Sequence, residues 1–183
     1  AAALSAAVLT GCGGSSASSS AAPSSVSEAQ VTSPASSAAA SSVGDNAAEN
    51  GSSALDGIYN TLLEADPISN QFEIAAMNIE YDFGLPAEDV ASYKGVKSND
   101  NGDAGLVLVI EAADGKAEDV ANKLAAYQQD QVAFYGNYAE FAQAQPNVEN
   151  AVIAFKDNTV VMVIASNEST ADLDSAVDSA LAN

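Results

Sequence analysis

The feature that most restricts the fold of this chain is a long serine- and alanine-rich tract near its start. Residues 13–53 contain fifteen serines and ten alanines, and they contain no aromatic residue. Such a tract cannot bury enough apolar surface to offset the conformational entropy that ordering would cost. We therefore expect residues 12–53 to be a disordered linker, and residues 54–183 to form a single small domain.

An uncharged stretch of small and apolar residues, residues 1–11, precedes the only cysteine of the chain, Cys12. A helix of this length, at about 1.5 Å per residue, is too short to cross a hydrocarbon core of about 30 Å. We interpret residues 1–11 as the remnant of a signal peptide. Leu9-Thr10-Gly11-Cys12 resembles the lipobox of bacterial lipoproteins, although an ordinary secretory signal followed by an incidental cysteine is the alternative.

The lipobox resemblance implies a location and a membrane contact. The thiol of Cys12 would carry a diacylglyceryl group through a thioether, and two or three acyl chains give stable anchoring where one alone is marginal. The protein would then sit on the outer face of the bacterial cytoplasmic membrane. A flexible linker from residue 13 to residue 53 would have a root-mean-square span of about 35 Å, which would hold the domain away from the bilayer.

The charge of the chain excludes several classes of function. The chain has 25 acidic residues, five lysines and no arginine, which gives a net charge of −20. Nucleic acid phosphates would repel it, so we expect no nucleic-acid partner. The chain has no histidine, and its single cysteine is assigned to the anchor. We therefore expect no thiolate catalysis, no zinc site and no cofactor, and we predict that the protein is not an enzyme.

Apolar periodicity predicts the elements of the domain. The first helix should begin near Ser53 and end at Asp66-Pro67, and a long helix should follow Gly115, with a bend or break at Gly136 and an end at Pro146. Ser169 or Thr170 should cap a last helix. The other expected elements are a strand at 79–83, a short helical turn at 86–90, and strands at 90–97, 105–111, 151–155 and 159–165.

The order of these elements favours an α+β fold. Strands at 90–97 and 105–111 flank the turn sequence of residues 98–103, and Lys156-Asp157-Asn158 is a tight hairpin signal. We expect one antiparallel sheet of four or five strands, with the helices packed on one face.

Residues 55–183 resemble a bacterial lipoprotein family, the domain of unknown function 4358. Three segments carry the resemblance: Met77-Asn78, residues 86–94 (PAEDVASYK) and residues 148–166 (VENAVIAFKDNTVVMVIAS). The family brings no known reaction. The resemblance therefore implies the architecture and the anchoring, and it favours an organism with a single membrane.

Aromatic residues gather in the long helix and its extension, and they form our candidate binding site. Neutral glutamines and asparagines surround them, which suits a sugar or peptide ligand or a partner protein. Aromatics at helical spacing also suit a hydrophobic core, and that alternative stays open. The candidate residues are Tyr127, Phe134, Tyr135, Tyr138 and Phe141.

Acidic residues offer two other kinds of chemistry, and neither is specific. Three pairs could act as acid–base couples: Glu88-Asp89, Glu118-Asp119 and Asp172 with Asp174. Their places near expected helix starts also suit a purely structural role. Asp100-Asn101-Gly102-Asp103 offers oxygen ligands for weak calcium binding, but it lacks the register of an EF-hand loop, and a hairpin turn is the favoured interpretation.

Three functions remain after these exclusions. We expect a lipid-anchored, extracytoplasmic interaction or ligand-binding module, whose partner is an envelope protein or a cell-wall ligand. The first alternative is a cell-wall hydrolase that works through carboxylates alone, which needs two carboxyl groups in one cleft and a raised pKa on one of them. The second is a structural component of the envelope with no specific ligand.

Overall fold

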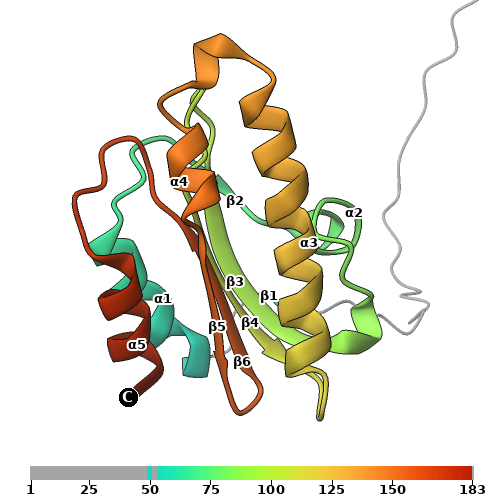
Figure 1. The fold of residues 1–183 in the computed structure, drawn as a ribbon. Helices are drawn as coiled ribbons and strands as arrows, with labels where there is room; N and C mark the ends of the chain where they lie inside the picture. Colours follow the sequence, from blue (N-terminus) through green and yellow to red (C-terminus); the bar gives the residue numbers. More distant parts are fainter. Residues whose placement is uncertain (1–48, 51–52, 183) are drawn as a thin grey trace, which may run out of the picture. The chain divides into compact units, whose positions relative to one another are not determined.

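A computed structural model of the chain describes residues 49–50 and 53–182 (Figure 1). The expected signal peptide remnant, Cys12 and most of the expected linker lie outside the described residues. Glu49–Asn50 falls within the expected linker, and this segment forms a short strand instead. It does so because the edge of a sheet offers its backbone hydrogen-bond partners.

The domain is built around one sheet with the strand order β1-β3-β4-β6-β5, and β2 also pairs with β3. The pairs β2–β3, β3–β4, β4–β6 and β5–β6 are antiparallel, which confirms the α+β class with an antiparallel sheet, and β1 alone runs parallel to its neighbour β3. The strands are β1 (Glu49–Asn50), β2 (Gln71–Glu73), β3 (Val90–Ser98), β4 (Leu106–Ala112), β5 (Val152–Lys156) and β6 (Thr159–Ile164).

Two hairpins join the central strands, as their turn sequences predict. Residues 99–105 connect β3 to β4, and the two-residue turn Asp157-Asn158 connects β5 to β6. Asp157 adopts a positive φ of 54°, a conformation that short polar side chains tolerate. The two hairpins lie side by side through the β4–β6 pairing, so local turn chemistry accounts for most of the sheet.

Five α-helices and two short 3₁₀ turns complete the described part of the chain. The first helix begins at Ser53 and ends before Asp66-Pro67, as expected, and the long helix follows Gly115. The helices are α1 (Ser53–Ala65), α2 (Ala76–Tyr81), α3 (Ala117–Gly136), α4 (Gln145–Glu149) and α5 (Leu173–Ala182), and the 3₁₀ turns are η1 (Ala87–Asp89) and η2 (Ala139–Phe141).

Helices cover both faces of the sheet, so the expectation of helices on one face is wrong. Helices α1 and α5 pack on one face, and α3 packs on the other with α2 and α4 near it (Figure 1). The reason is visible in β4, where every residue from Leu106 to Ile110 is at most 1% exposed. A continuous apolar strand of this kind needs cover on both sides.

Three local expectations also need correction. Residues 79–83 are not a strand, because residues 79–81 belong to α2 and residues 82–83 follow its end. The Asn78 side chain accepts a hydrogen bond from the Ala75 backbone N–H, and Ile79 and Phe83 are both buried. Pro146 does not end the long helix, which stops at Gly136; it lies in the first turn of α4.

The cap of the last helix is also displaced from its expected position. Asp172, rather than Ser169 or Thr170, accepts hydrogen bonds from the backbone N–H and the hydroxyl of Ser175, at 3.2 and 2.9 Å. These bonds hold the pKa of the Asp172 carboxyl below its usual value. Among the helices at 53–182, none combines the length and hydropathy that a membrane span requires.

Candidate functional site

Four of the five predicted aromatic residues come together at one end of the molecule. They lie on the last turn of α3 and between residue 138 and the end of η2, beside the β3–β4 loop (Figure 1). Neighbouring ring centroids are 5.3 to 5.7 Å apart, in tilted and edge-to-face arrangements that aromatic pairs favour. We call this group the aromatic cluster: Phe134, Tyr135, Tyr138 and Phe141.

Tyr127, the fifth predicted residue, lies apart from the aromatic cluster. Its ring packs against Phe83 with a centroid distance of 4.5 Å, and it contributes to the hydrophobic core on the α3 face. Burial away from water is the main cause that raises the pKa of the Tyr127 hydroxyl. The core interpretation therefore applies to Tyr127, and the cluster contains the other four residues.

The end of α3 explains how the aromatic cluster forms. The helix stops at Gly136, and the backbone N–H of Asn137 bonds to the Phe134 carbonyl at 3.2 Å. The chain then turns back through η2, where the Phe141 N–H bonds to the Tyr138 carbonyl at 3.0 Å. This reversal brings the Phe141 ring to a centroid distance of 5.4 Å from Tyr135, a pair six residues apart that would not be neighbours on a continuous helix.

The aromatic cluster is fixed to the β3–β4 loop at two points. The Tyr135 hydroxyl donates a hydrogen bond to the Asp103 carbonyl at 3.2 Å. Gly102 adopts a φ of +82°, and a Cβ atom added there would lie 3.3 Å from the Phe141 ring. The ring therefore packs closely over the glycine, which a larger residue would obstruct and whose positive φ favours glycine.

The β3–β4 loop is in turn bound to the segment that follows β6. One oxygen of the Asp103 carboxylate accepts hydrogen bonds from the backbone N–H groups of Gly105 and Asn167, at 3.1 and 3.0 Å. The Asn167 side chain donates to the Gly102 carbonyl at 2.9 Å. These contacts give Asp103 a structural role in the loop, in agreement with the hairpin interpretation of residues 100–103.

A buried carboxylate ties a third segment to the same place. Asp66, at the end of α1, is 0% exposed and accepts hydrogen bonds from the backbone N–H and the hydroxyl of Ser166. Burial raises the pKa of this carboxyl, and the nearby Asp103 charge raises it further, against the hydrogen bonds from Ser166 that lower it. Hydrogen bonds thus join the end of α1, the β3–β4 loop and the segment after β6, next to the aromatic cluster.

Two small cavities open next to this network, and Asp103 lines both of them. The first has a volume of about 200 Å³ and the second about 160 Å³. Tyr127 and Tyr135 border the second cavity. The first cavity is lined by Pro67, Ser69, Asp100, Asn101, Asp103, Ser166, Asn167 and Glu168.

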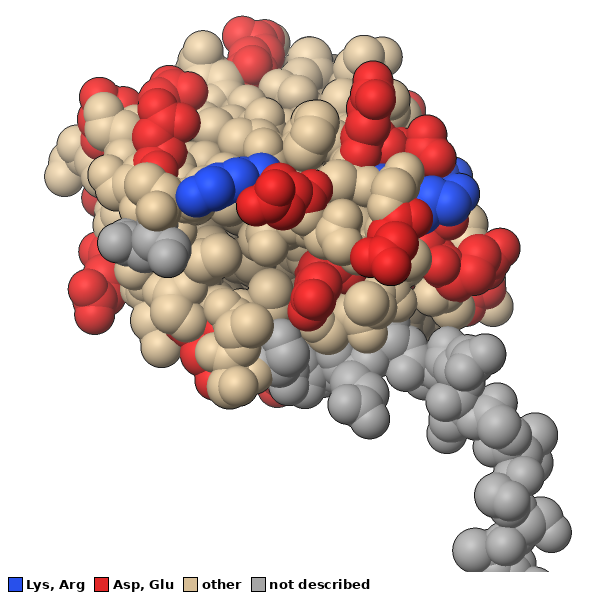
Figure 2. Space-filling model, turned by 90° about the horizontal axis from the view of Figure 1, so that it is seen from below, with Lys and Arg blue, Asp and Glu red and all other residues tan. Residues whose placement is uncertain are grey.

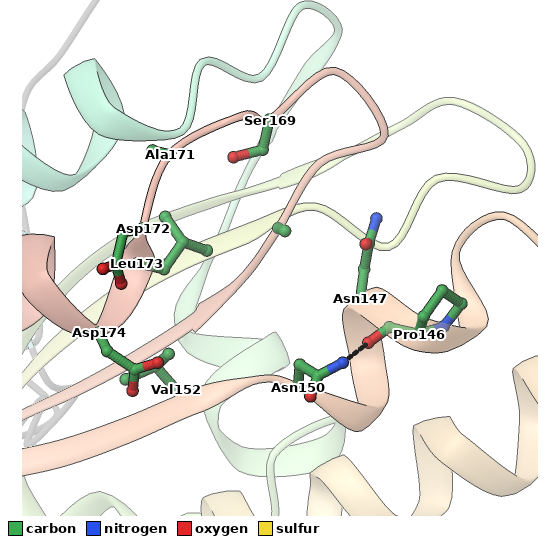
Figure 3. A pocket seen from close by; sticks show the side chains of 10 residues that line it. Pro146, Asn147, Asn150, Val152, Ser169, Ala171, Asp172, Leu173 and Asp174 are labelled. Carbon is green, nitrogen blue, oxygen red and sulfur yellow. Dashed lines mark hydrogen bonds between the residues drawn. The ribbon is translucent and has the colours of Figure 1, made fainter.

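A further cavity, of about 420 Å³, lies between α4 and the segment that leads into α5 (Figure 3). Val152, Ala165 and Leu173 contribute apolar surface to it. Figure 3 shows the Asn150 side chain donating a hydrogen bond to the Pro146 carbonyl, at 2.7 Å, with Asp172 and Asp174 across the cavity. No lysine lines this cavity.

Two of the glutamines near the aromatic cluster, Gln128 and Gln145, form hydrogen bonds within the domain. Gln128 donates to the carbonyls of Val148 and Glu149, at 3.0 and 3.2 Å, and so holds α4 against α3. Gln145 donates to the Glu149 carboxylate at 2.9 Å. Gln128 therefore serves the packing of the two helices, whereas the Gln145 bond lies within α4.

Of the predicted carboxylate pairs, Asp172 and Asp174 line the same cavity, of about 420 Å³. Asp89 is 6% exposed and forms an ion pair with Lys116 at 3.0 Å, while Asp119 lies 3.5 Å from the same lysine. Asp172 caps α5. Within residues 53–182, no group of three or more carboxylate or thiol side chains is arranged to hold a metal ion.

Negative charge is spread widely over the surface of the domain. Figure 2 shows red carboxylates distributed over the face seen from below, with the few blue lysines next to them. Lys97 pairs with Asp82 at 3.3 Å, and Lys94 pairs with Asp56. Lys94, Lys97 and Lys116 are thus paired with neighbouring acids, and a large negative excess remains.

Sequence reasoning found the aromatic cluster but missed its support. Asp66 is 100 residues from Ser166, and Asp103 is 64 residues from Asn167. No local pattern links residues at such separations. One signal was present in the sequence: Asp66-Pro67 ends a helix with an acid, at a position where an acid is unfavourable to the helix dipole.

Comparisons with known proteins identify the family of the chain. A family model described as a domain of unknown function (DUF4358) matches residues 65–165, which is more than half of the 183 residues. No curated protein and no solved structure matches the chain. The matched region runs from the last residue of α1 to the end of β6, and so includes Asp66, Asp103 and the aromatic cluster. The chain belongs to the DUF4358 family.

Proposed function

We propose that this protein is a lipid-anchored, extracytoplasmic binding module that contacts its partner or ligand through the aromatic cluster. The observation that carries the proposal is the exposure of two rings that pack against each other: Phe134 and Tyr138 are each 47% exposed, with centroids 5.4 Å apart. Such rings offer a large contact area, and their fixed positions reduce the side-chain entropy lost on binding.

The surroundings of the exposed rings favour a polar partner surface with an apolar centre. The two cavities beside the aromatic cluster are lined mainly by polar groups, among them Asp100, Asp103 and Asn167. Binding surfaces commonly combine an apolar aromatic core with a polar rim that supplies hydrogen bonds. An envelope protein or a cell-wall ligand rich in hydrogen-bond donors fits this combination.

The binding role is tested by capture from envelope extracts with purified domain variants. A Phe134→Ala, Tyr138→Ala double variant should lose at least about tenfold in capture, since two partly exposed rings act as binding anchors. Tyr81→Ala is the matched control, because Tyr81 is an exposed aromatic, at 74%, outside the aromatic cluster. Equal capture by the folded double variant and the wild type would exclude this surface.

The anchoring role rests on the lipobox resemblance of residues 9–12. In cells, the wild type should incorporate a labelled fatty acid and sediment with membranes. The Cys12→Ser variant should incorporate none and appear in the soluble or secreted fraction. Membrane sedimentation of an unlabelled Cys12→Ser variant would instead assign the membrane contact to another part of the chain.

One observation bears on the alternative of a carboxylate-dependent cell-wall hydrolase. Asp66 has a raised pKa, and the charge of the nearby Asp103 contributes to it. However, Asp103 lines the nearby cavity, and Asp66 is fully buried behind Ser166. A hydrolase would need the acid to reach its substrate. Release of soluble fragments from purified cell wall by the wild type, and not by Asp103→Asn, would favour the hydrolase.

A further inference from the structure

The strand β5 is an open edge of the sheet. It pairs with β6 on one side, and it is the last strand in the sheet order. Among the described residues, no strand pairs with its other side. The strand has no proline and no bulge, and its only charged residue is Lys156 at the end. It therefore lacks most of the devices by which proteins protect such edges.

The pairing of β5 shows which backbone groups point outward. Lys156 pairs with Thr159 across a two-residue turn, so these two residues exchange hydrogen bonds. The Ala112 N–H bonds to the Asn158 carbonyl, which confirms that even-numbered residues of β6 face β4 and odd-numbered ones face β5. By the same alternation, the N–H and C=O groups of Ile153 and Phe155 point away from the sheet.

Apolar side chains lie on the α3 face of this edge. Ile153 packs against the core beneath α3, and Phe155 follows it two residues later on the same face. Phe155 is 49% exposed, a large apolar surface at the open edge. A strand added next to β5 would therefore place apolar side chains against Phe155 on this face.

Acidic side chains lie along the other face of the edge, on α5. Asp174 lines the cavity of about 420 Å³ together with Val152, at the start of β5 (Figure 3). At the far end of the strand, the Lys156 ammonium group donates a hydrogen bond to the Leu181 carbonyl at 2.7 Å. Helix α5 therefore runs alongside β5, and Asp178, one turn after Asp174, lies on the same side of the helix.

From this geometry, we propose that the β5 edge binds an extended segment of a basic partner protein by strand addition. The segment alternates apolar side chains, which cover Phe155, with lysine or arginine side chains, which face Asp174 and Asp178. Its backbone bonds to the outward groups of Ile153 and Phe155, a recognition mode in which pockets for alternate side chains give specificity. The cavity at the start of the strand receives one of the basic side chains.

Charge decides between a basic partner and a second copy of this chain. The chain carries a net charge of −20, so two copies repel each other and a basic segment is attracted. Two copies paired at β5 would also bring two sets of α5 carboxylates together. The strand-addition site is separate from the aromatic cluster, so it stands or falls independently of the function proposed above.

The test uses the full chain and two synthetic peptides of about seven residues, the length of an ordinary strand. One peptide alternates lysine and valine, and the other alternates glutamate and valine. Amide hydrogen exchange should show slower exchange at Ile153 and Phe155 with the lysine peptide only. Raising the salt concentration should weaken this binding, since exposed charges contribute to it.

Two pairs of variants separate the backbone from the charge contribution. The backbone N–H of Phe155 points outward and does not bond to β6, so Phe155→Pro removes it without breaking the β5–β6 pairing. Phe155→Pro should therefore weaken peptide binding at least about fivefold relative to Phe155→Ala, which keeps that N–H. Asp174→Asn with Asp178→Asn should weaken it about two- to fivefold per residue. Asp130→Asn, on the exposed part of α3, is the control and should change nothing.

Three outcomes would overturn the strand-addition proposal. The first is equal binding of the glutamate and lysine peptides. The second is unchanged lysine-peptide binding by a folded Phe155→Pro variant, with the fold checked by circular dichroism. The third is slow exchange at Ile153 and Phe155 in a dimer without peptide, which would make a second copy the occupant. Loss of the aromatic cluster by Phe134→Ala should leave peptide binding intact.

Discussion

At the scale of single residues, the buried Asp66 carboxylate is the group that links the end of α1 to the segment after β6. Its two oxygens accept from the Ser166 backbone and hydroxyl, and no water-exposed surface remains on it. A buried acceptor of this kind holds distant segments together, and it costs free energy when it is ionised.

Asp66 should make the stability of the domain depend on pH. Its pKa in the folded state lies above the unfolded value of 3.8, so the folded state binds more protons between the two pKa values. The stabilisation from this group is complete below pH 3.8, and it is lost as the pH rises through the folded pKa. Chemical denaturation across this range should show the decrease in wild type.

The Asp66→Asn variant is the reference for that measurement, because an amide keeps an oxygen for the Ser166 N–H and does not titrate. The difference in unfolding free energy between the two proteins should change with pH in the stated direction, while Asp172 titrates equally in both. Asp66→Ala should cost about 1–3 kcal/mol, since it removes the acceptor of the buried Ser166 backbone N–H. A pH-independent difference would contradict the assigned role of Asp66.

At the scale of elements, the end of α3 and the β3–β4 loop stabilise each other through Tyr135. Tyr135→Phe removes the hydroxyl that bonds to the Asp103 carbonyl, and it should cost about 0.5–1.5 kcal/mol of unfolding free energy. Tyr138→Phe is the matched control, with an expected cost below about 0.5 kcal/mol because its ring is half exposed. Equal costs would show that the bond contributes nothing.

Most helices and strands could be predicted from the sequence, because the patterns that indicate them are local. The turn at Asp157-Asn158, the stop at Asp66-Pro67 and the apolar run of β4 each lie within one short window. Helix α2 was misread because Ile79, Tyr81 and Phe83 alternate as strand residues do. In a strand, Ile79, Tyr81 and Phe83 would share one face. Instead, Ile79 and Phe83 are buried while Tyr81 is 74% exposed.

At the scale of the whole molecule, the placement of the helices and the support of the aromatic cluster depend on contacts between residues far apart in the sequence. The five consecutive residues of β4 from Leu106 to Ile110 already indicated a sheet covered on both faces, and the expectation of one covered face overlooked that signal. The network of Asp66 with Ser166 and Asp103 with Asn167 joins residues far apart in sequence. The aromatic cluster could be predicted, but its support could not.

The whole molecule also carries two separate candidate surfaces. The aromatic cluster lies beside the β3–β4 loop, while the β5 edge runs beside α5. A module with both could hold one partner at two places or two partners at once. Their independence means that variants in one surface should leave binding at the other unchanged.

The measurement that tests the central claim most directly is crosslinking in living cells from position 138. A photoreactive amino acid replaces Tyr138 in the full chain, and a second strain carries it at Tyr81 as the control. The account predicts one abundant envelope protein or wall fragment captured from position 138 and absent from position 81. Identical products from both positions, or none from position 138 with the protein correctly folded and membrane-bound, would contradict a binding role for the aromatic cluster.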